Sequence, residues 1–270
     1  MTQPKDRPAL RHWQADHSVT AELIGEKQGQ PVSWHVAEEV PIAFVYNGNN
    51  YAVMLASPMD LLDFAYGFSF SEGIIDQASD IRKIEIHERK QGIDVMVTLS
   101  EQRLERFKVR RQRREIIGSS SCGLCGISSA EELFQPPVRV TETPVRVDYQ
   151  LAISAVADFQ QSQPFKKLNR SVHGAGWVNA LGEVVLVRED VGRHNALDKL
   201  IGALLQSGAD FSVGYCLISS RASYEMVSKA IRAQMPALIC LSAPTAFAIR
   251  TARAANLTLV NWSANRMVLF

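Results

Sequence analysis

The sequence predicts an α/β protein in which helices cover the faces of a largely parallel sheet, preceded by a smaller α+β region. In the second half of the chain, four short apolar runs alternate with helical stretches, an order typical of a parallel sheet with helices on its faces. In the first half, paired runs with strand periodicity surround a single helical run. A proline-containing stretch near residue 140 separates the halves. We therefore expect two domains, residues 31–140 and 141–270.

The chain begins with a segment that has no clear pattern. Residues 1–30 are polar and show no periodicity, so we expect a loose N-terminal arm. Val40 to Tyr46 and Tyr51 to Ala56 are apolar runs on either side of an Asn-Gly turn signal, which predicts a hairpin. Ser57 is expected to cap a helix that ends at Gly73.

The rest of the first half contains a second pair of strands and a basic helix. Ile81 to His87 and Ile93 to Leu99 alternate in the manner of paired strands. Glu101 to Arg114 is a helical stretch rich in arginine. Residues 118–126 are glycine and serine around a Cys-x-x-Cys pair, so the smaller domain is predicted to end in a mobile loop.

Residues 141–270 carry the predicted α/β domain. Strands and helices should alternate there, and ligands of such sheets bind beyond the carboxyl ends of the strands. The expected strands are Val184 to Val187, Val213 to Ser219, Ala237 to Leu241 and Leu257 to Val260, and the expected helices are Asn195 to Leu205, Ala222 to Gln234 and Thr245 to Ala255.

Bulk composition excludes several classes of protein. The 270 residues are 46% hydrophobic and 21% charged, which is ordinary for a globular protein. Lysine plus arginine number 29 and aspartate plus glutamate 28, so the net charge of +1 argues against a dedicated nucleic-acid or membrane-surface binder. No apolar run is long enough to cross a bilayer, and no signal-peptide core follows Met1. We expect a cytoplasmic protein.

Cys122 and Cys125 form a Cys-x-x-Cys pair, whereas Cys216 and Cys240 stand singly in apolar strand contexts and are predicted to be buried. Three chemistries are open to the pair. Structural zinc needs four ligands, and we expect no zinc here. A thioredoxin-like dithiol should lie between a strand and a helix, but this pair follows a basic helix and a serine run. Sulfur relay through a persulfide suits a glycine-flanked loop, and nearby arginines would favour the anionic sulfur.

The predicted strand ends are polar in a way that suits an anionic ligand. Ser220 to Ser223 and Ser242 to Thr245 open helices, and free amides, hydroxyls and an arginine at such points can bind phosphate. Helix capping alone explains any one of these segments, but their convergence on one sheet edge favours a nucleotide-like anion. The polar segments are residues 188–195, 219–225, 242–245 and 261–266.

Several residues at these ends have more than one interpretation. Trp262 could stack on a base or belong to the core. His194 could be an acid, a base or a phosphate ligand, or a buried histidine, and His173 is similarly ambiguous. Glu189 and Asp190 could bind ribose hydroxyls or a metal, or pair with the neighbouring arginines.

The run from Glu189 to Lys199, Glu-Asp-Val-Gly-Arg-His-Asn-Ala-Leu-Asp-Lys, resembles the signature of FdhD, the formate dehydrogenase accessory sulfurtransferase family. Ser219 to Met226, Cys122 to Gly126 and Gly67 to Ile75 also resemble segments of that family, and the likeness extends from about Glu38 to Arg266. The resemblance implies a homodimer with a fold similar to that of cytidine deaminase. The zinc deaminase signature is absent, so no deaminase activity follows.

The resemblance also implies a reaction. A cysteine desulfurase would load sulfur onto Cys122 as a persulfide, with Cys125 as second motif cysteine, and the acceptor would be the molybdenum bis(molybdopterin guanine dinucleotide) cofactor of formate dehydrogenase. GDP is the expected analogue. The implied cofactor-binding residues, including those from the strand ends, are Asn261, Trp262, Ser263, Ala264, Asn265, Arg266, Ser220, Arg221, Ser223 and His194.

Two departures from the family pattern concern the pocket. The family's Thr-Gly segment is replaced by Asn169 to Val172, and the final loop is shorter than usual. Two alternatives to sulfur transfer remain open: a cofactor-binding chaperone whose cysteines only grip the metal, and a dithiol oxidoreductase.

Overall fold

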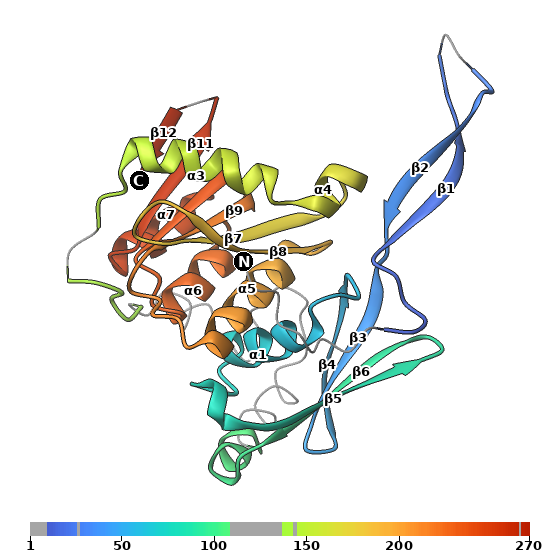
Figure 1. The fold of residues 1–270 in the computed structure, drawn as a ribbon. Coiled ribbons are helices and arrows are strands. Elements are labelled where there is room, and N and C mark those ends of the chain that lie inside the picture. The colour runs from blue at the N-terminus through green and yellow to red at the C-terminus, as the bar shows by residue number, and fades with distance from the viewer. Residues whose placement is uncertain (1–9, 26–27, 109–136, 143–144, 265) are drawn as a thin grey trace.

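The protein is a mixed α/β structure built around three sheets (Figure 1). The computed structural model describes residues 10–25, 28–108, 137–142, 145–264 and 266–270. Two of the sheets pack through helices into one hydrophobic core, and the third is a two-stranded ribbon that projects from the body. No helix within the described ranges is long and apolar enough to cross a membrane.

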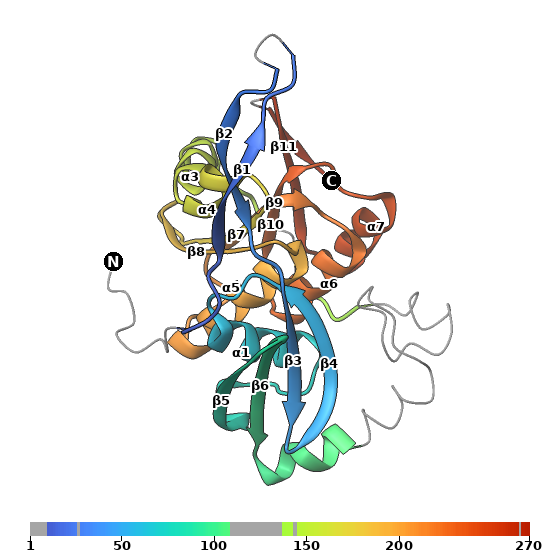
Figure 2. The same cartoon turned by 90° about the vertical axis from the view of Figure 1, so that its right-hand side faces the viewer.

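The projecting ribbon corrects the expectation of a patternless arm over residues 1–30. β1 (Asp16–Glu22) pairs antiparallel with β2 (Pro31–Ala37) (Figures 1 and 2). In this pairing Val19 lies opposite Trp34. Alternate positions of both strands are apolar, so the ribbon has one apolar face. This pattern is weak in β1 alone and becomes evident only when the two strands are paired.

Both predicted strand pairs of the first half are confirmed. β3 (Val40–Tyr46) and β4 (Asn49–Ala56) form one antiparallel pair, and β5 (Ile81–Arg89) and β6 (Gly92–Leu99) form the other. The four strands make a sheet of order β4-β3-β6-β5. The Asn-Gly turn has φ 46° at Asn47 and φ 80° at Gly48, as tight hairpins with two left-handed residues require.

A helix and a short 3₁₀ turn connect the two strand pairs. α1 (Leu61–Ser71) follows β4, and η1 (Ala78–Asp80) precedes β5. The predicted cap is wrong, because Asp60 occupies the N-cap position without a side-chain cap bond, and the hydroxyl of Ser57 is used elsewhere. Residues 101–108 are helical, and the rest of the predicted basic helix lies outside the described residues.

The second half forms a six-stranded mixed sheet of order β12-β11-β10-β9-β7-β8. The predicted parallel arrangement holds for the neighbouring strands β9, β10 and β11, whereas β7, β8 and β12 join it in antiparallel pairs. Two strands were not predicted from the sequence. β7 contains two glycines that weaken its strand pattern, and β12 has only four residues. The strands are β7 (His173–Val178), β8 (Val184–Asp190), β9 (Tyr215–Arg221), β10 (Ala237–Ser242), β11 (Thr258–Ser263) and β12 (Arg266–Leu269).

Helices cover both faces of this sheet (Figure 1). On one face α3 packs Phe159 and three smaller apolar side chains against the sheet, and on the other face α5, α6 and α7 join the core that also contains α1. The predicted helices of this half are confirmed to within a few residues. The helices are α3 (Tyr149–Gln161), α4 (Pro164–Asn169), α5 (Arg193–Ser207), α6 (Tyr224–Arg232) and α7 (Ala246–Ala254).

Candidate functional site

The polar segments predicted to converge do lie along one edge of the six-stranded sheet. β9, β10 and β11 run parallel, and β8 has the same direction because it is antiparallel to β7, which is antiparallel to β9. All four strands therefore end at this edge. β7 runs the other way and begins there, with His173 paired to Asp190 of β8. This edge is called the ligand edge below.

Two helix N-termini open at the ligand edge without side-chain caps. α5 begins after Gly192 and α6 begins after Ser223, and neither N-cap residue makes a side-chain cap hydrogen bond. α7 differs, because the hydroxyl of Thr245 accepts a hydrogen bond from the backbone N–H of Ala248 at 3.3 Å. Uncapped N-terminal amides carry partial positive charge and suit an anion. The competing interpretation of Ser223 as a helix cap is wrong, because its hydroxyl makes no cap hydrogen bond to α6.

Buried polar atoms at the same edge have no hydrogen-bond partner among the described residues. They are Nδ1 of His173, Nε of Arg193 and Oγ of Ser223. A buried polar group left without a partner costs about 1–3 kcal/mol. Three such atoms beside two free helix N-termini are the features of a surface that is completed by a ligand.

Two histidines lie at this edge in different electrostatic settings. His194 Nε2 is 2.6 Å from Glu225 Oε2, which joins the first turn of α5 to that of α6. Burial lowers the pKa of His173, and the cations of Lys166 and Arg193 lower it further, while Asp190 acts in the opposite direction. His173 is therefore neutral at neutral pH and can either donate or accept a hydrogen bond.

The two carboxylates of the Glu-Asp pair, for which ligand binding and pairing with an arginine were both open, are engaged in contacts within the fold. Glu189 accepts hydrogen bonds from the backbone N–H groups of Phe165 and Lys166 at 3.1 and 2.8 Å, at the start of α4. Asp190 is fully buried and lies 2.6 Å from the ammonium of Lys199. Neither carboxylate pairs with a neighbouring arginine in the described contacts.

The last predicted segment is a strand end and turn rather than an open loop. The amide of Asn261 is buried and donates to the carbonyls of Cys240 and Ser242, both at 3.1 Å, so it joins β11 to β10. Trp262 packs toward α3, with its ring 6.4 Å from that of Tyr149. It thus lies on the face opposite to the helices that supply His194 and Ser223.

The remaining predicted pocket residues are placed as follows. Ser220 is buried and donates to the carbonyl of Arg221 at 3.1 Å, while Arg221 itself is exposed at the end of β9. Arg266 pairs with Ser263 across the β11–β12 turn, and Ser263, Ala264 and Arg266 are exposed. Asn265 lies outside the described residues. The two exposed arginines remain available to an anion.

The four cysteines divide into two classes. Cys216 and Cys240 are fully buried in β9 and β10, as predicted. Burial raises the pKa of the Cys216 thiol strongly and that of Cys240 to about 11, so neither forms a thiolate at neutral pH. Cys122 and Cys125 lie outside the described residues.

Sequence reasoning placed Arg193 and Glu225 in the polar segments but gave neither of them a binding role. The pairing of His173 with Asp190 became apparent only from the fold. Arg193 and Glu225 each lie within the first two positions of a helix that starts at the ligand edge. That position, directly after a predicted strand end, was a signal that could have identified them.

Fold and site together define an α/β protein whose sheet edge carries two helix N-termini without side-chain caps and buried polar atoms that lack a hydrogen-bond partner among the described residues. The chain belongs to the FdhD/NarQ family, whose family model matches residues 37–270.

Individual relatives agree with this assignment. The chain is 46% identical over 230 residues to the sulfur carrier protein FdhD of Xanthomonas oryzae pv. oryzae, covering 85% of this chain and 81% of the relative. It is 49% identical over 231 residues to the protein of the same name from Cupriavidus necator, covering 84% and 78%. A crystal structure of a candidate formate dehydrogenase accessory protein from Desulfotalea psychrophila superposes with a TM-score of 0.72 at 25% identity, covering 95% of this chain and 96% of that one.

Proposed function

We propose that this protein is a cytoplasmic sulfur carrier, acting as a homodimer in the maturation of formate dehydrogenase. Cys122 takes sulfur from a cysteine desulfurase and passes it to the molybdenum bis(molybdopterin guanine dinucleotide) cofactor. The names of the curated relatives and the formate dehydrogenase role given to the similar crystal structure support this proposal. A cytidine-deaminase-like layering of the six-stranded sheet is part of the same proposal.

The observation that carries the proposal is that two of the four cysteines are fully buried and unsuited to carry sulfur. A sulfur carrier needs a thiol that ionises and meets two different proteins. Cys216 and Cys240 fail both requirements, because they are fully buried in central strands and their thiols have raised pKa values. Cys122 and Cys125 are the only other cysteines in the sequence, so sulfur carriage falls to them.

The loading step is an exchange between thiols. The Cys122 thiolate attacks the outer sulfur of the desulfurase persulfide and forms a new S–S bond to it. The S–S bond of the donor breaks, and the donor cysteine leaves as a thiolate. One sulfane sulfur moves from one protein to the other, with no net oxidation or reduction.

The acceptor would bind at the ligand edge. Phosphates of a guanine dinucleotide are the anions that free helix N-termini and arginines recognise. The N-termini of α5 and α6, with His194, Ser223 and Arg221, would hold one phosphate group. Molybdenum enters as part of the substrate and not as a resident metal of this chain.

Guanine nucleotide binding tests the edge directly. GDP should bind to the wild-type protein, and Arg221→Ala or Arg266→Ala should each weaken binding about tenfold or more, because each removes a charge-assisted contact to phosphate. Isothermal titration calorimetry measures the affinity. Arg253→Ala is the matched control, since Arg253 is an exposed arginine in the last turn of α7. Absence of heat and of thermal stabilisation with GDP would rule out the pocket.

The proposal also requires that the Cys-x-x-Cys pair does not hold structural zinc. Cys216 and Cys240 are fully buried in strands, so they are not available as further ligands for the pair. A structural zinc site usually needs four ligands. Metal analysis of the purified protein should therefore find far less than one zinc per chain. About one zinc per chain that disappears in Cys122→Ala would contradict this.

A further inference from the structure

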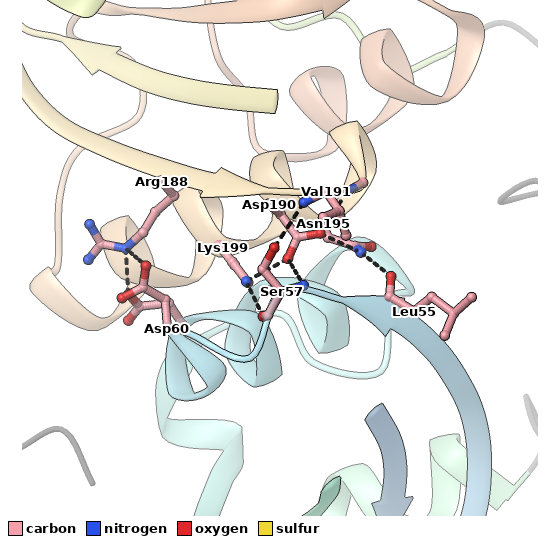
Figure 3. A network of polar contacts seen from close by, with 10 residues as sticks. Leu55, Ser57, Asp60, Arg188, Asp190, Val191, Asn195 and Lys199 are labelled. Atoms are coloured by element: carbon pink, nitrogen blue, oxygen red, sulfur yellow. Dashed lines mark hydrogen bonds and ion pairs between the residues drawn. The ribbon is translucent and has the colours of Figure 1, made fainter. Parts of the chain in front are cut away.

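A buried polar network ties the first turn of α5 to the first half of the chain (Figure 3). It is centred on Asp190 and Lys199, both with side chains 0% exposed and 2.6 Å apart. Ser57, in the junction between β4 and α1, contacts both of them. The side chains of two members of the FdhD-like signature thus contact the first half of the chain.

All four contacts of the Asp190 carboxylate are with donors. Oδ1 accepts from the backbone N–H of Gly192 at 2.8 Å and from the amide of Asn195 at 2.9 Å. Oδ2 accepts from the backbone N–H of Ser57 at 3.0 Å and from Lys199 at 2.6 Å. An amide group at this position cannot accept all four hydrogen bonds, because one of its two terminal atoms is itself a donor.

Two further hydrogen bonds connect the start of α5 and the turn before it to the end of β4 and the β4–α1 junction. The Ser57 hydroxyl accepts from the backbone N–H of Val191 at 3.1 Å, and the amide of Asn195 donates to the carbonyl of Leu55 at 2.8 Å. A Cβ on Gly192 would lie 2.7 Å from the amide nitrogen of Asn195. Residues 190–192 are therefore fixed between β8 and the β4–α1 junction.

The next two residues, Arg193 and His194, belong to the ligand edge. We infer that Asp190 is a positioning residue: through Gly192 and Asn195 it sets where the first turn of α5 presents Arg193 and His194 to the anion. Its link to Ser57 makes the placement of this turn depend on the first half of the chain, which also carries the Cys-x-x-Cys pair in sequence. The inference rests on the proposed function for the identity of the anion only.

The same helix offers a matched control. Asp198 is also buried, is held by Lys229 at 2.6 Å and by the hydroxyl of Ser71 at 2.6 Å, and so also joins α5 to the first half of the chain. It lies within α5, beyond the first turn. Asp190→Asn and Asp198→Asn both neutralise a buried carboxylate paired with a lysine, but only Asp190→Asn disturbs the turn.

The test is amide hydrogen exchange followed by NMR, which needs no ligand. Both variants should lower the melting temperature, whereas only Asp190→Asn should speed exchange of the backbone amides of residues 191–194, on the order of tenfold or more relative to Asp198→Asn. If Asp190→Asn does not fold, Ser57→Ala replaces it, because it removes only the acceptor for Val191. Equal exchange of residues 191–194 in the test variant and in Asp198→Asn would overturn the inference.

GDP titration below the melting temperature adds a functional readout. Asp190→Asn should bind GDP about tenfold or more weakly than wild type, and Asp198→Asn should bind as wild type does. If wild type binds GDP and Asp190→Asn binds it equally well, the positioning role is wrong. If wild type does not bind GDP, the proposed nucleotide site fails, and the exchange experiment alone decides the role of Asp190.

Discussion

Replacing Cys122 with alanine is expected to abolish both persulfide loading by a cysteine desulfurase and activation of formate dehydrogenase. Cys125→Ala should still load sulfur and should transfer it less well. Cys122 is the position that the family resemblance assigns to the carrier, and it directly follows the serine run after the arginine-rich stretch. A nearby positive field lowers the pKa of a thiol and stabilises the anionic persulfide.

Loading can be followed with radiolabelled sulfur from cysteine, and activation by formate oxidation in a reconstituted maturation assay. Cys216→Ala and Cys240→Ala are the controls, because both thiols are buried in the sheet. GDP binding should be unchanged in Cys122→Ala, since the ligand edge lies in the other half of the chain.

Each result that would contradict this prediction favours a different cysteine assignment or a different function for this protein. Normal loading of Cys122→Ala with loss in Cys125→Ala would reverse the two assignments. Normal loading of both variants would exclude the loop as the carrier and favour the cofactor-binding chaperone. A Cys122–Cys125 disulfide that forms and is reduced with turnover would favour the dithiol oxidoreductase.

Gly202→Ala and Gly67→Ala are each expected to destabilise the protein by about 3 kcal/mol or more, at the upper end of overpacking effects. The two glycines lie where α1 crosses α5. A Cβ on Gly202 would lie 1.8 Å from the carbonyl oxygen of Asp63, and one on Gly67 would lie 1.7 Å from that of Asp198. Both neighbours are backbone, so the helices themselves must separate.

The sign of this effect distinguishes packing from helix propensity. In an exposed helix interior, glycine to alanine stabilises by about 1 kcal/mol. Urea unfolding of the two variants should instead show a large loss, and the double variant should lose less than the sum because the same helix separation relieves both contacts. A gain in stability from either single change would show that α1 and α5 are not packed as described.

Local patterns were sufficient to predict the strands and helices whose signals are strong. The turn at Asn47 and Gly48 and the alternating residues of β5 and β6 predicted both hairpins of the first half, and strand–helix alternation predicted α5, α6 and α7. β1 was missed because its apolar positions are few and become informative only beside β2. β7 was missed because Gly174 and Gly176 weaken its strand pattern; a Cβ at Gly176 would meet the Phe159 ring at 2.7 Å.

The ligand edge was predictable in outline, because parallel strands place their polar ends together. The individual roles were less so. Asp190 was open to ligand binding or to pairing with an arginine, and Lys199 had no assigned role, yet both contact Ser57, more than a hundred residues earlier in the chain. Trp262 and Asn261 were assigned to the pocket, but sheet alternation directs one toward α3 and the amide of the other into the β10–β11 pairing. Such long-range contacts leave no local trace in a sequence.

The resemblance to FdhD, drawn mainly from residues 189–199, is confirmed by the family match over residues 37–270. The structure gives that signature a physical meaning. Glu189 holds the start of α4, Asp190 and Lys199 hold the turn before α5, and Asp198 anchors α5 to the first half of the chain. Arg193 and His194 lie in the first turn of α5, at the ligand edge.

The most direct test of sulfur carriage is to map the persulfide on the wild-type protein. After incubation with a cysteine desulfurase and cysteine, alkylation and peptide mass spectrometry should find one additional sulfur atom on Cys122, with none on Cys216 or Cys240. Sulfur on either buried cysteine, or no added sulfur on any cysteine while formate dehydrogenase is still activated, would contradict the account.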